Sequence, residues 1–280
     1  MNLIIQALNP VAENHLITLA GLTKAVRREQ LALNAWRLLD AQAHPDIAGY
    51  CLEHQLDYGF VPAARSLQDF GLVVMDMDST LITIECIDEI ADMQGLKPQV
   101  AAITEAAMRG ELDFAASLRR RVALLAGLEV QALQRVYEER LGLSRGAELM
   151  LTALQARGIK IMLVSGGFTF FTERLKQRLG LDFTHANTLE IIDGKLTGRV
   201  LGSILDAQGK ADLLLKISSE LGLSAAQVIA MGDGANDLKM MAQAGISIAF
   251  HAKPVVREKA SYALNFVGLD GLLPLLGNAA

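Results

Sequence analysis

Two aspartates follow a short apolar run and supply carboxylate groups that could bind a metal. Residues 72 to 75 are Leu-Val-Val-Met, and Asp76, Asp78, Ser79 and Thr80 come after them. Such a run predicts a strand buried on both faces of a parallel sheet, and ligands bind beyond the carboxyl ends of such strands. Two crowded carboxylates repel each other unless a cation holds them or one stays protonated. The pattern indicates a hard divalent metal placed against a reacting group, with a polar turn as the open alternative.

Two later apolar runs, residues 159 to 164 and 228 to 231, end in segments rich in glycine and polar residues. These segments are Ser165-Gly166-Gly167 and Gly232-Asp233-Gly234-Ala235-Asn236-Asp237. Because the carboxyl ends of parallel strands share one edge of a sheet, we expect Ser165 and Asp233 to lie near Asp76. Residues from three separate parts of the chain would then form one site.

The predicted site would combine a metal-binding part with an anion-binding part. Asp76, Asp78 and Asp233 offer oxygen ligands of the kind that Mg²⁺ prefers. Ser165 and Gly166 precede a predicted helix, whose first N–H groups and positive dipole end would bind an anion. A metal next to an anion site is suited to chemistry on a charged substrate.

Each of these segments also has a simpler interpretation. Two glycines after a strand are a common turn sequence, and residues 232 to 237 could form a helix-capping turn. Lys210 stands near the start of a predicted helix, where the helix dipole disfavours a cation, so it is either solvated or close to a phosphate. Taken one by one, the segments leave these alternatives open.

Alternating strands and helices from residue 146 onward have to position these side chains. This alternation predicts an α/β fold with a doubly wound parallel sheet, and Asp193-Gly194 between two apolar runs predicts a β-hairpin. Residues 84 to 145 have a helical pattern broken by glycines, so we expect an inserted helical cap that acts as a lid. Residues 70 to 83 and 146 to 280 would form the core.

Residues 1 to 69 have a sequence pattern that differs from the rest of the chain and predicts a small α+β N-terminal domain. Residues 3 to 5 suit a strand, 12 to 26 and 47 to 56 suit helices, and 31 to 39 are ambiguous. Two interpretations stay open for this domain. One is a packing or oligomerisation domain, through which the chain could form a homodimer, and the other is a regulatory module for a small ligand.

Composition excludes several classes of function. The chain has 280 residues, of which 51% are apolar and 20% charged, and its net charge is −5. No basic run exceeds residues 119 to 121, so the chain lacks the basic stripe of a nucleic-acid-binding protein. No apolar run reaches the roughly 18 residues of a membrane span, and residues 1 to 22 lack the basic start of a signal peptide. With Cys51 and Cys86 as reduced thiols, we expect a soluble cytoplasmic protein.

Taken together, the motifs resemble those of a known superfamily. They are Asp76-Met77-Asp78-Ser79-Thr80, Ser165-Gly166-Gly167, Lys210 and Gly232-Asp233-Gly234-Ala235-Asn236-Asp237. In type and order they are similar to the four motifs of the haloacid dehalogenase superfamily, and the helical insert is similar to that superfamily's first cap type. Residues 70 to 280 resemble more closely its phosphoserine phosphatase family. The N-terminal part weakly resembles the accessory domains of bacterial members, some of which are βαββαβ amino-acid-binding modules.

The resemblance implies a role for each residue of the motifs. Asp76 would be the nucleophile that becomes an aspartyl phosphate, and Asp78 would be the general acid and base. Mg²⁺ would be bound by Asp76, by the backbone carbonyl of Asp78 and by Asp233. Asp237 would hold a metal-bound water or Lys210. The transferring phosphoryl group would be surrounded by Ser165, Gly166, Lys210 and Asn236.

The resemblance also implies how the cap selects a substrate. Glu85 would accept the ammonium group of phosphoserine, and Arg121 would bind its carboxylate. Met108 and Phe114 would close the pocket over the substrate. The simpler interpretation is that Met108 and Phe114 belong to the core of the cap and that residues 119 to 121 form a solvated face.

The activity implied by the resemblance is Mg²⁺-dependent hydrolysis of O-phospho-L-serine to L-serine and phosphate, the last step of serine biosynthesis. The partner would be this small-molecule substrate, with neither nucleic acid nor membrane involved. Two alternatives stay open. One is phosphatase or phosphotransferase activity on another small phosphomonoester such as phosphohomoserine, and the other is a non-catalytic amino-acid-binding protein.

Overall fold

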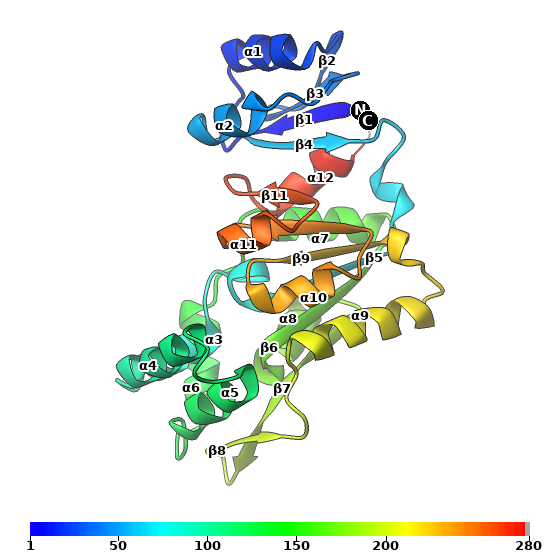
Figure 1. Cartoon of the computed structure of the whole chain (residues 1–280). Helices are drawn as coiled ribbons and strands as arrows, with labels where there is room; N and C mark the ends of the chain where they lie inside the picture. Colours follow the sequence, from blue (N-terminus) through cyan, green and yellow to red (C-terminus); the bar gives the residue numbers. More distant parts are fainter. Residues whose placement is uncertain (278–280) are drawn as a thin grey trace.

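The computed structural model describes residues 1–277, apart from the side chain of Met108. It contains one four-stranded and one seven-stranded β-sheet. Helices accompany both sheets, and Figure 1 shows the smaller sheet stacked on one end of the larger. No helix in the described residues is both long and apolar enough to cross a membrane.

The beginning of the chain forms a βαββαβ arrangement, which we call the N-terminal unit. Its elements are β1 (Asn2–Gln6), α1 (Glu13–Thr23), β2 (Arg27–Ala32), β3 (Ala35–Leu39), α2 (Asp46–Glu53) and β4 (Asp57–Val61). The strands pair antiparallel in the order β2-β3-β1-β4, so the expected α+β class is confirmed. The ambiguous residues 31–39 contain the turn between β2 and β3. The predicted helix over residues 12–26 ends at Thr23, because Lys24 adopts the left-handed conformation that terminates helices.

The larger sheet has the predicted doubly wound, mainly parallel arrangement. Its strands are β5 (Leu72–Met75), β6 (Lys160–Phe168), β7 (Phe183–Ile192), β8 (Lys195–Leu201), β9 (Val228–Gly232), β10 (Ile246–Phe250) and β11 (Tyr262–Leu264). They lie in the order β11-β10-β9-β5-β6-β7-β8, and all pairs are parallel except β7 with β8. The predicted hairpin joins β7 to β8, and both Asp193 and Gly194 have the positive φ that a two-residue hairpin turn requires.

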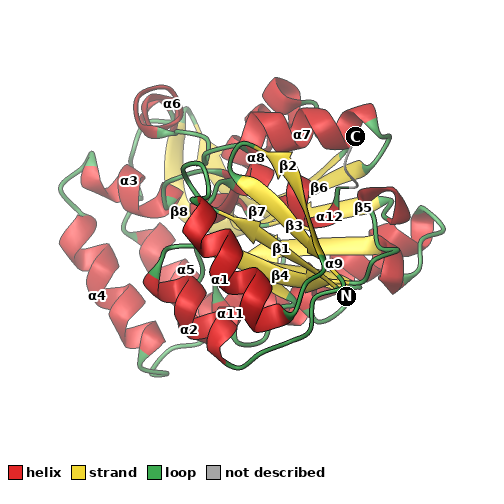
Figure 2. Cartoon of the chain, turned by 90° about the horizontal axis from the view of Figure 1, so that it is seen from above, coloured by secondary structure: helices red, strands yellow, loops and turns green. Residues whose placement is uncertain are grey.

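Helices cover both faces of this sheet and build the cap. Those around the sheet are α7 (Ala147–Ala156), α8 (Thr169–Leu179), α9 (Ala207–Glu220), α10 (Leu238–Met241), α11 (Pro254–Arg257) and α12 (Leu272–Leu276). Those inserted between β5 and β6 are α3 (Cys86–Asp92), α4 (Lys97–Met108), α5 (Phe114–Ala123) and α6 (Gln131–Arg135). Figures 1 and 2 both show α3 to α6 gathered on one side of the molecule, near β8. This segment is helical, as predicted.

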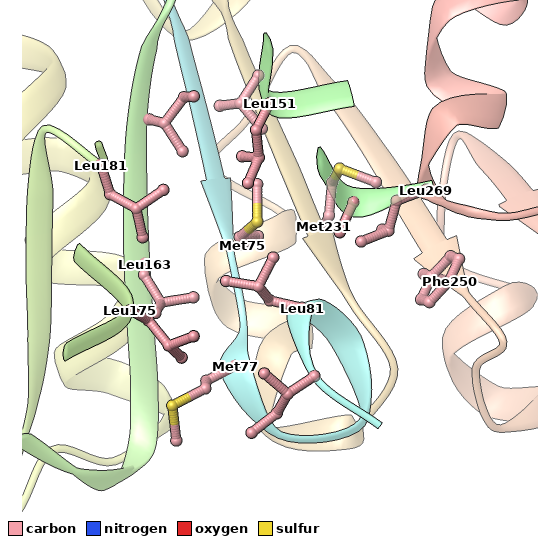
Figure 3. Packing of buried hydrophobic residues seen from close by; sticks show 14 of the residues in the cluster. Met75, Met77, Leu81, Leu151, Leu163, Leu175, Leu181, Met231, Phe250 and Leu269 are labelled. Carbon is pink, nitrogen blue, oxygen red and sulfur yellow. The ribbon is translucent and has the colours of Figure 1, made fainter. Parts of the chain in front are cut away.

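Alternate residues of the central strands face opposite sides of the sheet. Met75 of β5 belongs to an apolar cluster that includes residues of α7 and α8, whereas Val74 belongs to a second cluster with residues of α9 and α10. Figure 3 shows Met75, Leu163 and Met231, which come from three neighbouring strands, on the side that Leu151 of α7 covers. Because helices cover both faces, the central strand β5 is apolar along its whole length.

The N-terminal unit and the larger sheet share a continuous apolar core. β4 packs against β11 and α12, which Figure 1 shows lying next to it. Ile4 and Val61 of the unit belong to the same cluster as Leu275 of α12. Gln6, which is buried, also donates a hydrogen bond of 2.9 Å through Nε2 to the carbonyl oxygen of Gly271. The unit is therefore held by both apolar packing and polar contacts.

A glycine before β10 allows that strand to pack against the segment that precedes β9. A Cβ atom on Gly245 would lie 2.6 Å from Cα of Ala226 and 2.8 Å from the carbonyl oxygen of Ala225, and these backbone atoms cannot rotate away. We expect Gly245→Ala to lower the free energy of unfolding by about 2 kcal/mol because of this overlap. Denaturant unfolding measures the change.

The matched control for this variant is Gly49→Ala. Gly49 is exposed on α2, and no atom lies within 4 Å of a Cβ placed there. This change should leave stability unchanged or raise it by up to about 1 kcal/mol, because alanine favours the helix. Equal loss of stability in both variants would contradict the packing account of Gly245.

Candidate active site

The strand order brings the three predicted segments to one edge of the larger sheet. β5 pairs in parallel with β6 on one side and with β9 on the other. Asp76 follows the last residue of β5, Asp233 follows β9, and Ser165 lies in the second half of β6. All three line one cavity of about 580 Å³. The structure therefore brings these residues together as the strand-end rule requires.

Most of the predicted site residues line this cavity. On the side of the sheet they are Asp76, Asp78, Ser165, Gly166, Asp233 and Asn236. On the side of the cap they are Glu85, Phe114 and Arg121. Lys210 and Asp237 are buried and contact each other beside Asp76. Met108 ends α4, but its side chain lies outside the described part of the structure, so its role in closing the pocket stays a prediction.

A buried ammonium group links two carboxylates at this edge of the sheet. Lys210 Nζ lies 2.8 Å from Asp76 Oδ1 and 2.8 Å from Asp237 Oδ1. Burial lowers the pKa of Lys210, but Asp237 and Asp76 outweigh this effect and raise it, so the ammonium group stays charged. Lys210 is thus a paired residue and not a solvated one.

Three carboxylates are placed so that they could hold a metal ion. Asp76, Asp233 and Asp237 each offer an oxygen atom, and these atoms lie within 4.8 Å of one another. Lys210 neutralises only one of the three negative charges, and anionic oxygens are the ligands that hard divalent cations prefer. The residues therefore fit such a cation. The side chain of Asp78 is not in this group, so its predicted contribution to a metal rests on its backbone carbonyl.

The two aspartates of the first motif have different surroundings. Burial raises the pKa of Asp78 to about 7, and the neighbouring Glu85 adds to the shift. A carboxyl group that titrates near neutrality can both donate and accept a proton. Burial and Asp237 also raise the pKa of Asp76, while the ammonium group of Lys210 opposes them. Asp76 is thus held against a positive charge, whereas Asp78 lies toward the cap, where its Oδ1 accepts a hydrogen bond from a backbone N–H of α3.

A tight turn after β5 connects the first motif to Asp233. Residues Met77–Leu81 form this turn, and Ser79 has a left-handed φ of 56° within it. Thr80 then donates a hydrogen bond of 3.1 Å through Oγ1 to Asp233 Oδ1. Burial raises the pKa of Asp233 to about 6, and this hydrogen bond opposes the shift. Ser79 therefore gives the turn its left-handed bend, and Thr80 connects the turn to Asp233.

Close approach of other groups accounts for the two glycines after Ser165. A Cβ atom on Gly166 would lie 2.9 Å from the ring of Phe114, and one on Gly167 would lie 2.9 Å from Asp78 Oδ2. The backbone N–H of Gly167 donates a hydrogen bond of 2.8 Å to Ser165 Oγ. A side chain at either glycine would therefore displace a predicted site residue.

The cap presents one arginine and one glutamate to the cavity. Arg119 and Arg120 are exposed, whereas Arg121 is partly buried, and its Nε is buried without a hydrogen-bond partner among the described residues. Burial lowers the pKa of Arg121. Glu85 is exposed, and its Oε1 accepts a hydrogen bond of 2.8 Å from Ser79 Oγ. The solvated-face interpretation thus holds for the first two arginines but not for Arg121.

Two charged residues of the cavity wall were not predicted as site residues from the sequence. Asp88 of α3 faces the same cavity, and its charge opposes the lowering of the Arg121 pKa. It lies one helical turn after Glu85, so helical spacing could have indicated it. Lys253 follows β10 and also lines the cavity. The strand-end rule, applied to β10 as well, would have pointed to it.

Comparison with known proteins assigns a family to most of the chain. A family model described as haloacid dehalogenase-like hydrolase matches residues 70–245. A second model, a domain of unknown function (DUF4072), matches residues 3–47. A phosphoserine phosphatase of Polaromonas sp. is 56% identical over 215 residues, which cover 75% of this chain and 91% of that protein.

Solved structures show the same similarity in three dimensions. The unliganded structure of a probable phosphoserine phosphatase from Vibrio cholerae has a TM-score of 0.87 and 39% identity, covering 98% of this chain and 85% of that one. A structure described as a phospho-aspartyl intermediate analogue of phosphoserine phosphatase has a TM-score of 0.68 and 41% identity, covering 73% of this chain and 97% of that one. The chain therefore belongs to the haloacid dehalogenase-like hydrolases and, within them, to the phosphoserine phosphatases.

Proposed function

We propose that this protein hydrolyses O-phospho-L-serine to L-serine and phosphate, the last step of serine biosynthesis. The observation that carries the proposal is that one cavity contains both Asp76, paired with Lys210, and the cap residues Glu85 and Arg121. The first pair suits phosphoryl transfer, and the second suits the two charges of an amino acid. Relatives described as phosphoserine phosphatases support the same activity.

In this proposal, Asp76 attacks the phosphorus atom and the bond to the seryl oxygen breaks. Asp78 donates its proton to that oxygen, which leaves as the hydroxyl group of serine. Asp78 then takes a proton from a water molecule that attacks the aspartyl phosphate, so that phosphate leaves and Asp76 is restored. The pKa of about 7 for Asp78 supports both transfers. A phosphoserine phosphatase structure described as a phospho-aspartyl intermediate analogue supports the covalent step.

The remaining residues of the sheet edge would align and stabilise the phosphoryl group. Lys210 lies beside the attacking carboxylate, where its positive charge would offset charge on the phosphoryl oxygens. Ser165, Gly166 and Asn236 line the cavity around the same position. Asp237 holds Lys210 in place through the 2.8 Å contact.

We further propose Mg²⁺ as the metal. Asp76, Asp233 and the backbone carbonyl of Asp78 would hold it, in agreement with the acidic cluster at this edge. Bound there, Mg²⁺ supplies positive charge that stabilises the transferring phosphoryl group. Asp237 would act through Lys210 or through a metal-bound water.

The cap, proposed as residues 84–145, would select the substrate. Arg121 would bind the carboxylate of phosphoserine and Glu85 its ammonium group, while Met108 and Phe114 close the pocket. Nε of Arg121 has no hydrogen-bond partner in the described part of the chain, which supports this, because a substrate carboxylate would supply the missing acceptor. Residues 70–83 and 146–280 would form the catalytic core.

We propose an accessory role for residues 1–69, either in ligand regulation or in forming a homodimer. The complete βαββαβ unit in this part of the chain is compatible with both.

Cys51 and Cys86 are buried free thiols, which suits a reducing compartment, so we propose a cytoplasmic location.

Replacing the nucleophile tests the mechanism. Asp76→Asn keeps the size of the side chain but removes the attacking carboxylate, so phosphate release should fall at least about a thousandfold. Asp193→Asn is the matched control, because Asp193 is exposed in the β7–β8 turn and asparagine tolerates its positive φ. If Asp76→Asn is folded, as judged by circular dichroism, and still turns over substrate, the proposed mechanism is refuted.

A second variant tests substrate recognition. Arg121→Ala should lower kcat/KM for phosphoserine roughly 10- to 100-fold more than that for p-nitrophenyl phosphate, because only phosphoserine has a carboxylate to lose. Arg120→Ala is the control, since Arg120 is exposed on the same helix. If both substrates lose the same factor with Arg121→Ala, this arginine has a structural role instead.

A substrate panel with metal removal tests the activity itself. We expect phosphate release from L-phosphoserine in Mg²⁺ to exceed release from D-phosphoserine, phosphothreonine, phosphohomoserine and a sugar phosphate. EDTA should abolish it and excess Mg²⁺ should restore it, because the acidic cluster lacks enough positive charge of its own. A flat profile would refute the substrate assignment, and full activity in EDTA would refute the metal.

A further inference from the structure

A buried carboxylate of the N-terminal unit binds the backbone of the larger sheet. Asp57 begins β4 and is 1% exposed. Its Oδ1 accepts a hydrogen bond of 2.7 Å from the N–H of Asn265, and its Oδ2 accepts bonds of 2.9 Å from the N–H groups of Phe266 and Val267. Three successive N–H groups thus surround one carboxylate, and they would be left without partners in its absence.

The segment that Asp57 binds is attached to the next loop of the sheet edge. Residues 265–267 follow β11, and His251 follows the neighbouring β10. The N–H of His251 donates to the carbonyl oxygen of Leu264 at 2.8 Å. Its Nε2 lies 2.9 Å from the carbonyl oxygen of Val267, and because a carbonyl can only accept, Nε2 must carry the proton. His251 also has a left-handed φ of 45°, so these contacts hold it in a conformation that few residues adopt.

The loop after β10 is attached in turn to the loop after β9. The backbone N–H of Lys253 donates a hydrogen bond of 3.1 Å to the carbonyl oxygen of Asp233. β9, β10 and β11 are consecutive in the sheet, so their loops lie in a row along the edge that carries the site. Asp233 lies in the loop at one end of this row, and Asp57 binds the loop at the other end.

We propose that Asp57 is a positioning residue for the loop of Asp233, acting through Val267 and His251, and that the N-terminal unit thereby tunes metal affinity. The inference rests on the proposed role of Asp233 as a metal ligand. Groups that orient metal ligands typically change metal affinity 10- to 100-fold when removed. Because Asp57 acts through intervening loops, we expect an effect at the lower end, about tenfold.

The test compares two buried residues that face each other across β1 and β4. Asp57→Asn replaces one acceptor oxygen with an N–H₂ group that opposes the N–H groups of residues 265–267. Gln6→Met removes the hydrogen bond from Gln6 to Gly271, which also links the unit to the core but whose acceptor is not bonded to His251. Mn²⁺ binding to the full-length protein is measured by electron paramagnetic resonance, and the Mg²⁺ concentration for half-maximal phosphate release is measured beside it.

Asp57→Asn should raise the Mn²⁺ dissociation constant and the Mg²⁺ requirement about tenfold, with kcat at saturating Mg²⁺ nearly unchanged. Gln6→Met should leave both near the unsubstituted values. Equal shifts in the two variants, or no shift in Asp57→Asn, would overturn the inference. If the unsubstituted protein itself fails to bind Mn²⁺, the proposed metal site is refuted instead, so the two failures are distinguishable.

His251 supplies a second test that holds even if Asp57→Asn does not fold. Glutamine places its amide nitrogen near the position of histidine Nε2, whereas the amide of asparagine reaches only to that of Nδ1. His251→Gln should therefore keep metal affinity, and His251→Asn should weaken it about as much as Asp57→Asn does. The double variant Asp57→Asn with His251→Asn should be no weaker than either single one, because both interrupt the same row of contacts. Equal metal affinity in His251→Gln and His251→Asn would contradict the proposal.

Discussion

The burial of one ammonium group between two carboxylates determines much of this site. Lys210 is 1% exposed and lies 2.8 Å from both Asp76 and Asp237. A lysine removed from water stays charged only with such partners, and each carboxylate in turn depends on the lysine. The arrangement also requires Gly232, since a Cβ atom there would lie 2.5 Å from the carboxylate carbon of Asp237. Glycine at position 232 is therefore required for this ion pair to form.

The parallel sheet gives this ion pair its neighbours. Because β6, β5 and β9 are adjacent, the chain needs no long-range loop to bring Ser165, Asp76 and Asp233 together. The same edge continues through the loops after β10 and β11 to the N-terminal unit. One series of hydrogen bonds, made by backbone groups and by the side chains of Asp57 and His251, therefore links the candidate site to the N-terminal unit.

Local patterns predicted the core and its motifs, but not contacts that depend on distant partners. The run over residues 72 to 75 predicted a strand buried on both faces, and β5 is fully buried. β2 was not predicted, because residues 27–32 are mostly charged or polar. They lie at the edge of the smaller sheet, where pairing with β3 determines the conformation. Asp57 carries no local signal, since its partners lie 208 to 210 residues further along the chain.

Arg121 illustrates what the helical period can and cannot predict. Phe114, Leu118 and Arg121 recur at the spacing of one face of α5, so the period could have separated Arg121 from Arg119 and Arg120. It could not predict that Nε lacks a hydrogen-bond partner among residues 1–277, because that depends on how the cap lies over the core. A buried N–H group without an acceptor destabilises the ligand-free state, and the proposed substrate carboxylate would relieve this penalty. A phosphomonoester without a carboxylate would leave the penalty in place, so discrimination would come from the charge of Arg121 more than from the shape of the pocket.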